Sequence, residues 1–397
     1  MIALSHRITQ LSESETLAMA RKSRELKAQG FDVINLSLGE PDFFTPTYIK
    51  EAAKTAIDEN YSFYTPVNGY LELRQAICNK LKRDNQLEFA PDQIVVTTGA
   101  KQALINALLC LVNPGEEVIV AAPYWVSYRD MVKLAEGEAV YVKAGIESDF
   151  KVTPEQLEAA ITPKTRMFMF SSPCNPTGSV YTRQELKALA EVFERHPQVY
   201  ILSDEIYEHI NFSGKHESIA QFESVRERVI IINGVSKGFA MTGWRVGYLA
   251  AHIDIAKACT KLQGQFTSGT NSIAQRATIA AMDADPANTY LMLEKFRERR
   301  DLVLDLMKDI PGMITNIPEG AFYVFPNVKA YFGKTDGETV VKDAPDLCMY
   351  LLNKAQVALV PGDAFGDPEC IRFSYATSND LLVEAVARIK KALAELK

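Results

Sequence analysis

The sequence predicts an α/β protein. We expect a large domain with a mostly parallel seven-stranded sheet flanked by helices, plus a smaller α+β lobe formed by the amino- and carboxyl-terminal segments. Two patterns support this prediction. From about residue 70 to residue 250, short and nearly continuous apolar runs alternate with helical segments, which is typical of buried parallel strands joined by helical crossovers. After about residue 290 the pattern changes to a long charged helix followed by short elements.

The first elements belong to the amino-terminal segment. Residues 12–29 have the spacing of an amphipathic helix, with Ser12 and Glu15 as an expected capping box and Gly30 as the stop signal. The apolar run 33–36 follows and ends in a turn sequence at 39–42. Seven further apolar runs are the expected strands of the sheet: 94–98, 117–121, 139–142, 165–170, 199–203, 229–233 and 247–251.

The later segments complete the predicted organisation. Residues 182–195 are an expected crossover helix, residues 290–308 are the charged helix, and the polar stretch 327–345 is typical of a surface loop. We therefore expect an amino-terminal arm that forms part of the small domain (1–45), a large domain (46–290) and a small carboxyl-terminal domain (291–397).

The composition narrows the classes of function. The 397 residues include 43 Lys and Arg against 50 Asp and Glu, a net charge of −7, which argues against a nucleic-acid partner. No window approaches the roughly 18 uncharged apolar residues of a membrane span, so we expect no membrane partner. The six cysteines are scattered, without a Cys-x-x-Cys pair or a histidine at ligand spacing. This predicts reduced thiols in the cytoplasm and no metal site.

Unusual polar residues follow four of the expected strands. Asn175 follows the strand 165–170, Asp204 and Tyr207 follow 199–203, Ser236 and Lys237 follow 229–233, and Gly99-Ala100-Lys101 follows 94–98 and opens a helix. In an open α/β sheet, ligands bind at the carboxyl ends of the strands. Each group also has an ordinary interpretation by itself, as a surface charge, a helix cap or a turn. Their joint occurrence favours one shared binding site.

A lysine, a carboxylate and a glycine-opened helix together suit a pyridine aldehyde phosphate. The lysine amine forms a Schiff base with the aldehyde. The carboxylate pairs with the protonated ring nitrogen and keeps the ring an electron sink. Phenol and amide donors hold the ring oxygen, while backbone amides at the helix start, with serine and arginine, hold the phosphate.

Five motifs in sequence order extend this interpretation: YTP at 64–66 with Gly69, Leu73 and Arg74; SPCNPTG at 172–178; DEIY at 204–207; GVSKGFAMTGWRVG at 234–247; and IRFSY at 371–375. They resemble, in the same order, motifs of the class I/II aminotransferases, which are pyridoxal-phosphate (PLP) enzymes of fold type I. The motif at 234–247 looks like the family's cofactor-lysine signature. One departure is Cys174, where the family commonly has a second asparagine. Because Asn175 is retained, we expect Cys174 to be a small packed residue.

The resemblance implies a role for each residue. Lys237 would be catalytic, binding pyridoxal 5'-phosphate and moving a proton between the substrate Cα and the cofactor. Asp204 would pair with the ring nitrogen, Tyr207 and Asn175 would bond the ring oxygen, and Trp125 would stack on the ring. The phosphate would be held by Arg245, Ser236, the amides of Gly99, Ala100 and Lys101, and Tyr64 of a partner subunit. A homodimer with shared active sites is therefore expected.

The resemblance also implies how amino-acid and 2-oxo-acid substrates bind. Arg372 would grip the α-carboxylate, next to Trp125 and Asn175, and Gly39 would approach the substrate through its backbone. In the bacterial and plastid aspartate aminotransferase subgroup that this chain resembles, a lysine in Gly-x-Lys-Gln binds the distal carboxylate, assisted by a serine and a threonine. Lys101, Ser14 and Thr16 would fill these places, although a surface lysine and two helix-capping residues are the alternatives.

The expected activity is therefore transfer of the amino group between L-aspartate and 2-oxoglutarate, with amination of prephenate to arogenate as a possible second activity. An aromatic or alanine aminotransferase, or a PLP β-lyase on the same fold, shares the cofactor motifs and stays an alternative. A non-enzymatic regulator would need an added DNA-binding module, for which the chain has no spare length. A nicotinamide dehydrogenase is disfavoured, because no Gly-x-Gly-x-x-Gly follows the first strand.

Overall fold

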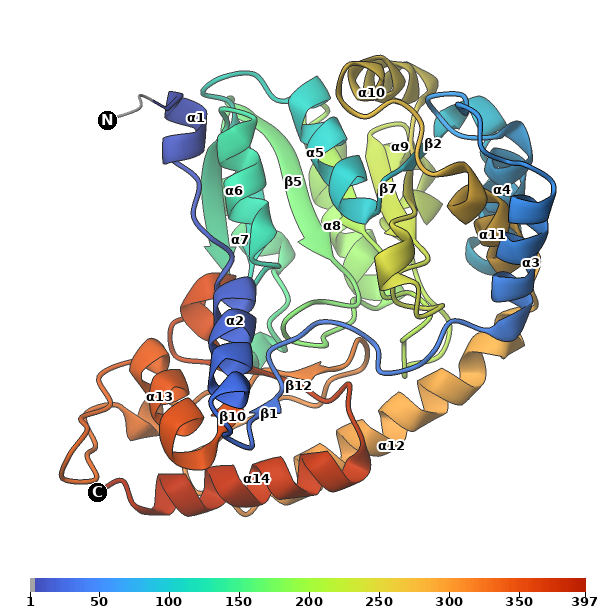
Figure 1. Cartoon of the computed structure of the whole chain (residues 1–397). Coiled ribbons are helices and arrows are strands. Elements are labelled where there is room, and N and C mark those ends of the chain that lie inside the picture. Colours follow the sequence, from blue (N-terminus) through green and yellow to red (C-terminus); the bar gives the residue numbers. More distant parts are fainter. Residues whose placement is uncertain (1–3) are drawn as a thin grey trace.

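The computed structural model describes residues 4–397 and shows two lobes (Figure 1). The larger lobe contains a seven-stranded sheet in the order β2-β8-β7-β6-β5-β3-β4. Only β8 runs antiparallel to its neighbours. The strands are β2 Ile94–Thr97, β3 Glu117–Ala122, β4 Glu138–Lys143, β5 Thr165–Ser171, β6 Tyr200–Asp204, β7 Val229–Gly234 and β8 Gly247–Ala250. The predicted fold class and all seven expected strands are confirmed.

Helices cover both faces of this sheet. They are α3 Thr47–Asp58, α4 Leu71–Asn85, α5 Ala100–Leu111, α6 Ser127–Leu134, α7 Pro154–Ala160, α8 Arg183–Arg195, α9 Glu223–Arg226, α10 Ile253–Phe266 and α11 Ser272–Asp283. Alternate strand residues enter two separate cores, because successive side chains of a strand point to opposite faces. Ile231 packs in the core that contains α4, α8 and α11, whereas Ile230 and Ile232 pack in the core that contains α5, α6 and α10.

The smaller lobe combines both ends of the chain. Its helices include α2 Glu15–Ala28, α12 Tyr290–Met307, α13 Ala344–Tyr350 and α14 Asn379–Ala394. The short α1 (His6–Thr9) lies instead beside the larger lobe, where Arg7 pairs with Glu136 (Figure 1). A three-stranded antiparallel sheet has the order β11-β12-β9, from Val360–Pro361, Ile371–Ser374 and Tyr323–Val324. The strand β1 (Ile34–Asn35) pairs in parallel with β10 (Val357–Ala358). The amino-terminal segment is therefore joined to the carboxyl-terminal segment by backbone hydrogen bonds.

Several local predictions have a clear outcome. The expected capping box of Ser12 and Glu15 is wrong, because α2 begins at Glu15 itself and Ser14, with an extended backbone, occupies the N-cap position without a side-chain cap bond. Gly30 follows the end of α2 with φ of 94° and stops the helix as expected. The expected helices 182–195 and 290–308 correspond to α8 and α12. Among residues 4–397, no helix is both long and apolar enough to cross a membrane.

Candidate active site

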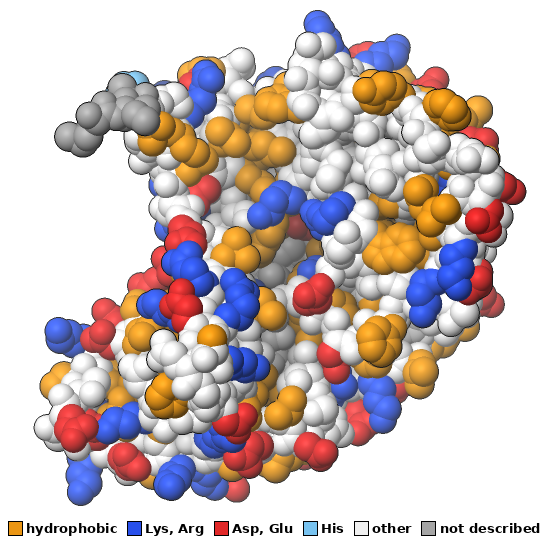
Figure 2. Space-filling view, in the orientation of Figure 1, with side chains coloured by type: hydrophobic (Ala, Val, Ile, Leu, Met, Phe, Trp, Pro, Cys, Tyr) orange, Lys and Arg blue, Asp and Glu red, His pale blue; other side chains and the backbone are white. Residues whose placement is uncertain are grey.

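A cavity of about 370 Å³ lies where the carboxyl ends of the sheet strands face the smaller lobe. Figure 2 shows the molecule hollowed between the two lobes, with lysine and arginine side chains gathered along the hollow. Strand ends supply most of its lining: Asp204 ends β6, Asn175 follows β5, and Ser236 and Lys237 follow β7. The smaller lobe contributes Arg372 from β12 and Tyr323 from β9.

Lys237 lies at the centre of the site. Its Nζ donates a hydrogen bond to the carbonyl oxygen of Gly39 at 2.6 Å. Burial lowers the pKa of Lys237 to about 8, and the nearby cations Arg372 and Arg245 act in the same direction. Glu40 and Asp204 oppose this shift. The amine is therefore partly neutral near physiological pH, as a nucleophile or a base requires.

Asp204 is a buried carboxylate at the floor of the cavity. Tyr128 donates its hydroxyl hydrogen to Oδ2 at 2.7 Å, and the amide of Ile206 donates to Oδ1 at 3.2 Å. Burial raises the pKa of Asp204 to about 6, although the bond from Tyr128 opposes the shift. At pH 7 the group is mostly ionised, and it suits a cationic ring nitrogen.

Arg372 is a buried cation that has no acidic partner among residues 4–397. Its side chain is 1% exposed, and it donates to Asn175 Oδ1 at 2.9 Å and to the carbonyl oxygen of Ser37 at 2.6 Å. Its guanidinium carbon lies 4.6 Å from the ring centre of Tyr323 and 4.8 Å from that of Phe365. Its Nε is buried and makes no hydrogen bond within residues 4–397. A buried guanidinium with a free donor is prepared for a carboxylate ligand.

Two cations lie near the start of α5. Lys101 belongs to its first turn, whereas Arg245 comes from the segment before β8 and reaches the helix start with its side chain. Lys101 Nζ is 3.2 Å from Ser127 Oγ and 4.8 Å from the ring centre of Trp125. Burial lowers the pKa of Lys101, and Arg245 adds to this effect. Gly99 caps the helix with φ of 76°, and a Cβ there would clash with the Arg245 guanidinium. Glycine is therefore needed to let Arg245 approach the helix amino terminus, where anions bind favourably.

The charges lining the cavity do not balance. Lys101, Lys237, Arg245 and Arg372 make hydrogen bonds only to neutral groups within residues 4–397. The two acidic residues of the lining are Asp204 and Glu40, and Glu40 accepts a hydrogen bond from Thr242. Four cations against two carboxylates in a partly desolvated cavity favour anionic ligands.

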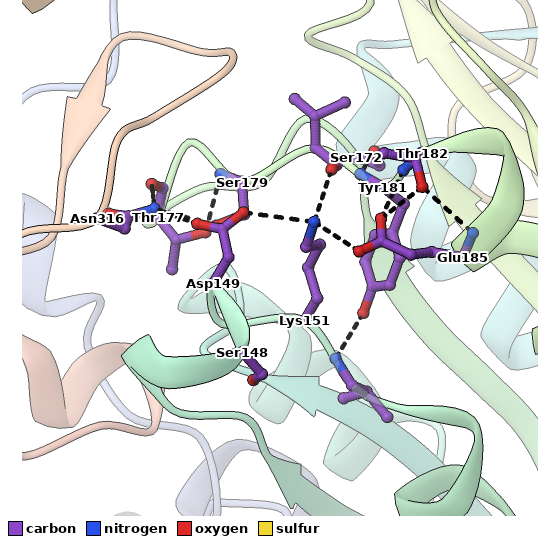
Figure 3. A network of polar contacts seen from close by, with 12 residues as sticks. Ser148, Asp149, Lys151, Ser172, Thr177, Ser179, Tyr181, Thr182, Glu185 and Asn316 are labelled. Atoms are coloured by element: carbon purple, nitrogen blue, oxygen red, sulfur yellow. Dashed lines mark hydrogen bonds and ion pairs between the residues drawn. The ribbon is translucent and has the colours of Figure 1, made fainter. Parts of the chain in front are cut away.

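A polar network holds the turn that carries Asn175 (Figure 3). Asn316 donates to Asp149 Oδ1 at 2.8 Å and to Ser179 Oγ and Thr177 O at 3.3 Å each. Lys151 Nζ lies 3.5 Å from Asp149 and 2.7 Å from Glu185. Gly178 (φ 68°) accepts backbone bonds from Glu319 and Gly320 at 2.9 and 2.8 Å. The turn is thus tied to both the large lobe and the carboxyl-terminal segment.

The structure brings most of the predicted site residues together. Those that line the cavity are Ser14, Thr16, Gly39, Ala100, Lys101, Trp125, Asn175, Asp204, Tyr207, Ser236, Lys237, Arg245 and Arg372. Gly99 lies behind Arg245 instead of in the lining. Tyr64 lies outside the cavity, with a fully exposed side chain. Cys174 is buried, as expected of a packed residue.

Sequence reasoning missed several lining residues, among them Tyr128, Thr242, Glu40 and Tyr323. Glu40 adjoins the predicted Gly39 and could have been included on that ground. Tyr128 is the second residue of α6 and comes three residues after the predicted Trp125. Tyr323 lies within the run 321–325, which is typical of a buried hydrophobic core. No sequence pattern therefore marks it as a site residue.

The whole chain is similar to known aminotransferases. The model of the family described as "Aminotransferase class I and II" matches residues 32–389. The aspartate/prephenate aminotransferase of Cereibacter sphaeroides is 48% identical, and the alignment covers all of both chains. The aspartate aminotransferase structure from Rhizobium meliloti has a TM-score of 0.97 at 42% identity and also covers all of both chains. The Thermus thermophilus aspartate aminotransferase with maleate has a TM-score of 0.93 at 39% identity, covering 99% of this chain and 100% of that chain.

The family match spans most of the chain, and the relatives align over nearly their full lengths. The predicted resemblance is therefore confirmed, and this chain belongs to the class I and II aminotransferase family.

Proposed function

We propose that this chain is a PLP-dependent aspartate aminotransferase, which transfers the amino group between L-aspartate and 2-oxoglutarate in two half-reactions and yields oxaloacetate and L-glutamate. The observation that carries the proposal is a set of four cations around one cavity that also contains Asp204; within the described part of the chain these cations bond only to neutral groups. A phosphate and two substrate carboxylates would supply the missing negative charge.

The residues present fit pyridoxal 5'-phosphate. Asp204 would pair with its ring nitrogen, while Tyr207 and Asn175 would hold its ring oxygen. Arg245, Ser236 and the amides at the start of α5 would hold its phosphate, with Trp125 against the ring. When bound, the cofactor supplies an electron sink for the electrons released at the substrate Cα.

Lys237 would be both the attachment point for the cofactor and the proton carrier. A neutral Nζ is needed for each role, and burial lowers the pKa of this amine to about 8. Nζ would take the proton from the substrate Cα and return it on the cofactor side. Its hydrogen bond to Gly39 O, at 2.6 Å, keeps the amine pointed into the cavity.

Arg372 and Lys101 would bind the two ends of a dicarboxylic substrate. Arg372 would take the α-carboxylate, because the residues that the structure describes give its buried guanidinium no acidic partner and its Nε no acceptor. Lys101 would take the distal carboxylate, assisted by Ser14 and Thr16, which line the same cavity. Maleate, which is present in the related Thermus thermophilus structure, is itself a dicarboxylate.

A second activity, amination of prephenate to arogenate, is favoured by a specific observation. A second hollow adjoins the cavity at Lys101. Both are lined by Lys101, Ser14, Val126 and Ser127. Its lining includes the apolar side chains of Leu11, Ile105, Met131 and Leu134. This hollow provides space for a ring that aspartate lacks. The name of the Cereibacter sphaeroides relative includes prephenate.

The working enzyme would be a homodimer in the cytoplasm. Phe44, Phe63 and Tyr64 are 93%, 80% and 100% exposed, and such large apolar side chains suit a subunit interface. A site shared across that interface would explain why Tyr64 lies outside the cavity of its own chain. The six cysteines are free, which suits a reducing compartment.

The deciding experiment profiles amino donors and oxo acids with the purified protein and with Lys101→Ala. We expect aspartate and glutamate to be the preferred donors, and Lys101→Ala to raise KM for both while alanine kinetics change little. Lys187→Ala, an exposed lysine paired with Glu191 on α8, is the matched control. Preference for alanine or aromatic donors would contradict the dicarboxylic assignment. Release of pyruvate and ammonia from cysteine conjugates would indicate a β-lyase.

Prephenate is tested separately, with glutamate as donor and arogenate as the measured product. We expect arogenate to form and Lys101→Ala to slow its formation. If no arogenate forms while aspartate transamination is normal, the second activity is absent.

A further inference from the structure

Tyr323 is a buried residue that sequence reasoning passed over. It lies on β9, where it pairs with Ser374 of β12, the strand that also carries Arg372. Its side chain is 0% exposed to outside solvent, yet it lines the cavity. It is thus a part of the carboxyl-terminal segment that reaches the groups presented by the sheet strands.

Three groups of the site meet at Tyr323. Its hydroxyl lies 2.8 Å from the hydroxyl of Tyr207. Its ring lies against Arg372, whose guanidinium carbon is 4.6 Å from the ring centre. A Cβ at residue 39 would lie 2.5 Å from the Tyr323 hydroxyl, so Gly39 has to be glycine for this packing. Gly39 in turn accepts the bond from Lys237.

Either hydroxyl of the Tyr323–Tyr207 pair could donate, and the two directions leave different hydrogens for a ligand. A phenol has one hydrogen to donate. The bond to Tyr207 is the one hydrogen bond that the Tyr323 hydroxyl makes within residues 4–397. If Tyr207 were the donor, its single hydrogen would be used and could not serve a ligand in the cavity. If Tyr323 donates, the hydrogen of Tyr207 remains available.

We propose that Tyr323 is a positioning residue for Tyr207: it donates to the Tyr207 hydroxyl and thereby directs the Tyr207 hydrogen toward the ring oxygen of the cofactor. This inference rests on the proposed function, since it assumes that PLP binds here. The ring of Tyr323 also supports the face of Arg372. One side chain thus orients the group for the cofactor oxygen and the group for the substrate carboxylate.

Both phenols keep their hydrogens in the working pH range. Burial holds the pKa of Tyr207 well above its ordinary value and raises the pKa of Tyr323. Hydrogen bonds in series strengthen one another, so Tyr207 becomes a better donor when it accepts from Tyr323. A donor at the ring oxygen stabilises negative charge there and favours loss of the proton from the lysine-bound cofactor.

The test is a spectroscopic pH titration of the PLP-loaded enzyme and of Tyr323→Phe, Tyr207→Phe and the double variant. In Tyr323→Phe we expect the pH midpoint of the visible absorbance change to rise by about half a unit to one unit, the size expected of one weakened hydrogen bond. In the Tyr207→Phe background, the same substitution should add no further shift. Tyr350→Phe, which removes a buried hydroxyl bonded to Ala392 O at 3.0 Å, is the matched control and should titrate as the wild type does.

Kinetics separate the two roles of Tyr323. Tyr323→Phe keeps the ring against Arg372, so KM for aspartate should stay within about twofold, whereas Tyr323→Leu should raise it by about tenfold or more. An unchanged midpoint in Tyr323→Phe, or shifts that simply add in the double variant, would overturn the proposal. A wild-type protein that shows no visible absorbance with PLP would instead overturn the proposed function, so the two failures are distinct.

Discussion

Lys237 differs from an ordinary lysine because of what surrounds it. Burial and the cations Arg372 and Arg245 lower the pKa of its amine to about 8, whereas Glu40 and Asp204 oppose them. The protonated amine cannot attack an aldehyde, so reactivity depends on the neutral fraction, which grows as pH rises toward the pKa. Surroundings assembled from distant segments thus determine the chemistry of this one side chain.

We expect the rate at which the cofactor-free protein captures PLP to follow this titration. Below pH 8 the neutral fraction changes about tenfold per pH unit, so the rate should rise with pH and level off above about 8. Stopped-flow absorbance of the lysine-bound cofactor measures this rate of capture. A rate that keeps rising toward pH 10.5, the ordinary lysine value, would show that the pKa is not lowered. Lys237→Ala is the control: it should bind PLP without this absorbance and lose turnover by several orders of magnitude.

At the residue scale, the sequence was informative where a chemical group stood out from its surroundings. Lys237, Asp204 and Arg372 are charged residues at the ends of, or within, apolar strands, and this made them visible. Tyr323 is an aromatic residue among aromatic and aliphatic neighbours, and nothing local reveals that its hydroxyl reaches Tyr207. Distances and pKa shifts depend on contacts between segments far apart in the chain, so they required the structure.

The turn at 172–178 shows how elements cooperate. Its Asn175 accepts from Arg372 of the smaller lobe, while Asn316 donates both to Thr177 of the turn and to Asp149, which pairs with Lys151 (Figure 3). Asn316 is largely buried and gives its amide hydrogens to Asp149, Thr177 and Ser179. Removal of this donor would leave acceptors unsatisfied on both sides of the turn.

We therefore expect Asn316→Asp to destabilise the protein by about 2 kcal/mol or more, because a second carboxylate would face Asp149 in a poorly solvated place. The urea midpoint of unfolding measures the effect. The matched control is Asn379→Asp, where the same substitution faces Glu298 on the exposed surface and should cost less than about 0.5 kcal/mol. KM for aspartate should also rise in Asn316→Asp, since Asn175 would no longer be held against Arg372. Equal effects of the two substitutions would contradict the role given to the network.

At the element scale, the length of an element decided how well it was predicted. The seven sheet strands were visible because buried parallel strands are continuous apolar runs. The strands β1, β9, β10 and β11 span two residues each, which is too short for any periodic pattern. The start of α2 was placed too early, because Ser12 fits the capping-box pattern with Glu15, whereas Ser14, the actual N-cap, has Leu17 at that spacing and makes no side-chain cap bond.

At the scale of the whole molecule, the hydrophobic cores suggest how the chain is divided. Two cores draw on residues 49–282, and a third draws on both ends of the chain with a few residues between 207 and 212. A small fourth core joins Val126 and Phe150 of the larger lobe to residues 325–370. We propose that residues 46–290 act as a large PLP-binding domain and that 291–397, with part of 1–45, act as a small domain. The cavity lies between them, so movement of one against the other would change its access.

The proposed homodimer makes a prediction about complementation between subunits. Tyr64 is fully exposed and lies outside the cavity of its own chain, so it would act in the site of the partner. Lys237→Ala lacks the reactive amine, and Tyr64→Ala should hold PLP weakly and be nearly inactive when PLP is scarce. In a mixed dimer one site combines both defects, whereas the other has an intact Lys237 and an intact Tyr64.

Mixing the two variants under conditions that exchange subunits should therefore restore activity at low PLP, to about one quarter of the wild-type value when half of the dimers are mixed. Sedimentation of the wild type should give the mass of a dimer. The control is a mixture of two proteins that both carry Lys237→Ala, one of which also carries Tyr64→Ala. This mixture should stay inactive, because no site regains the lysine. A monomeric protein, or the absence of any restored activity in a mixture shown to contain mixed dimers, would mean that each chain builds its site alone. The exposed phenol of Tyr64 would then be an ordinary surface group, and the phosphate would be held by Arg245, Ser236 and the start of α5 within one chain.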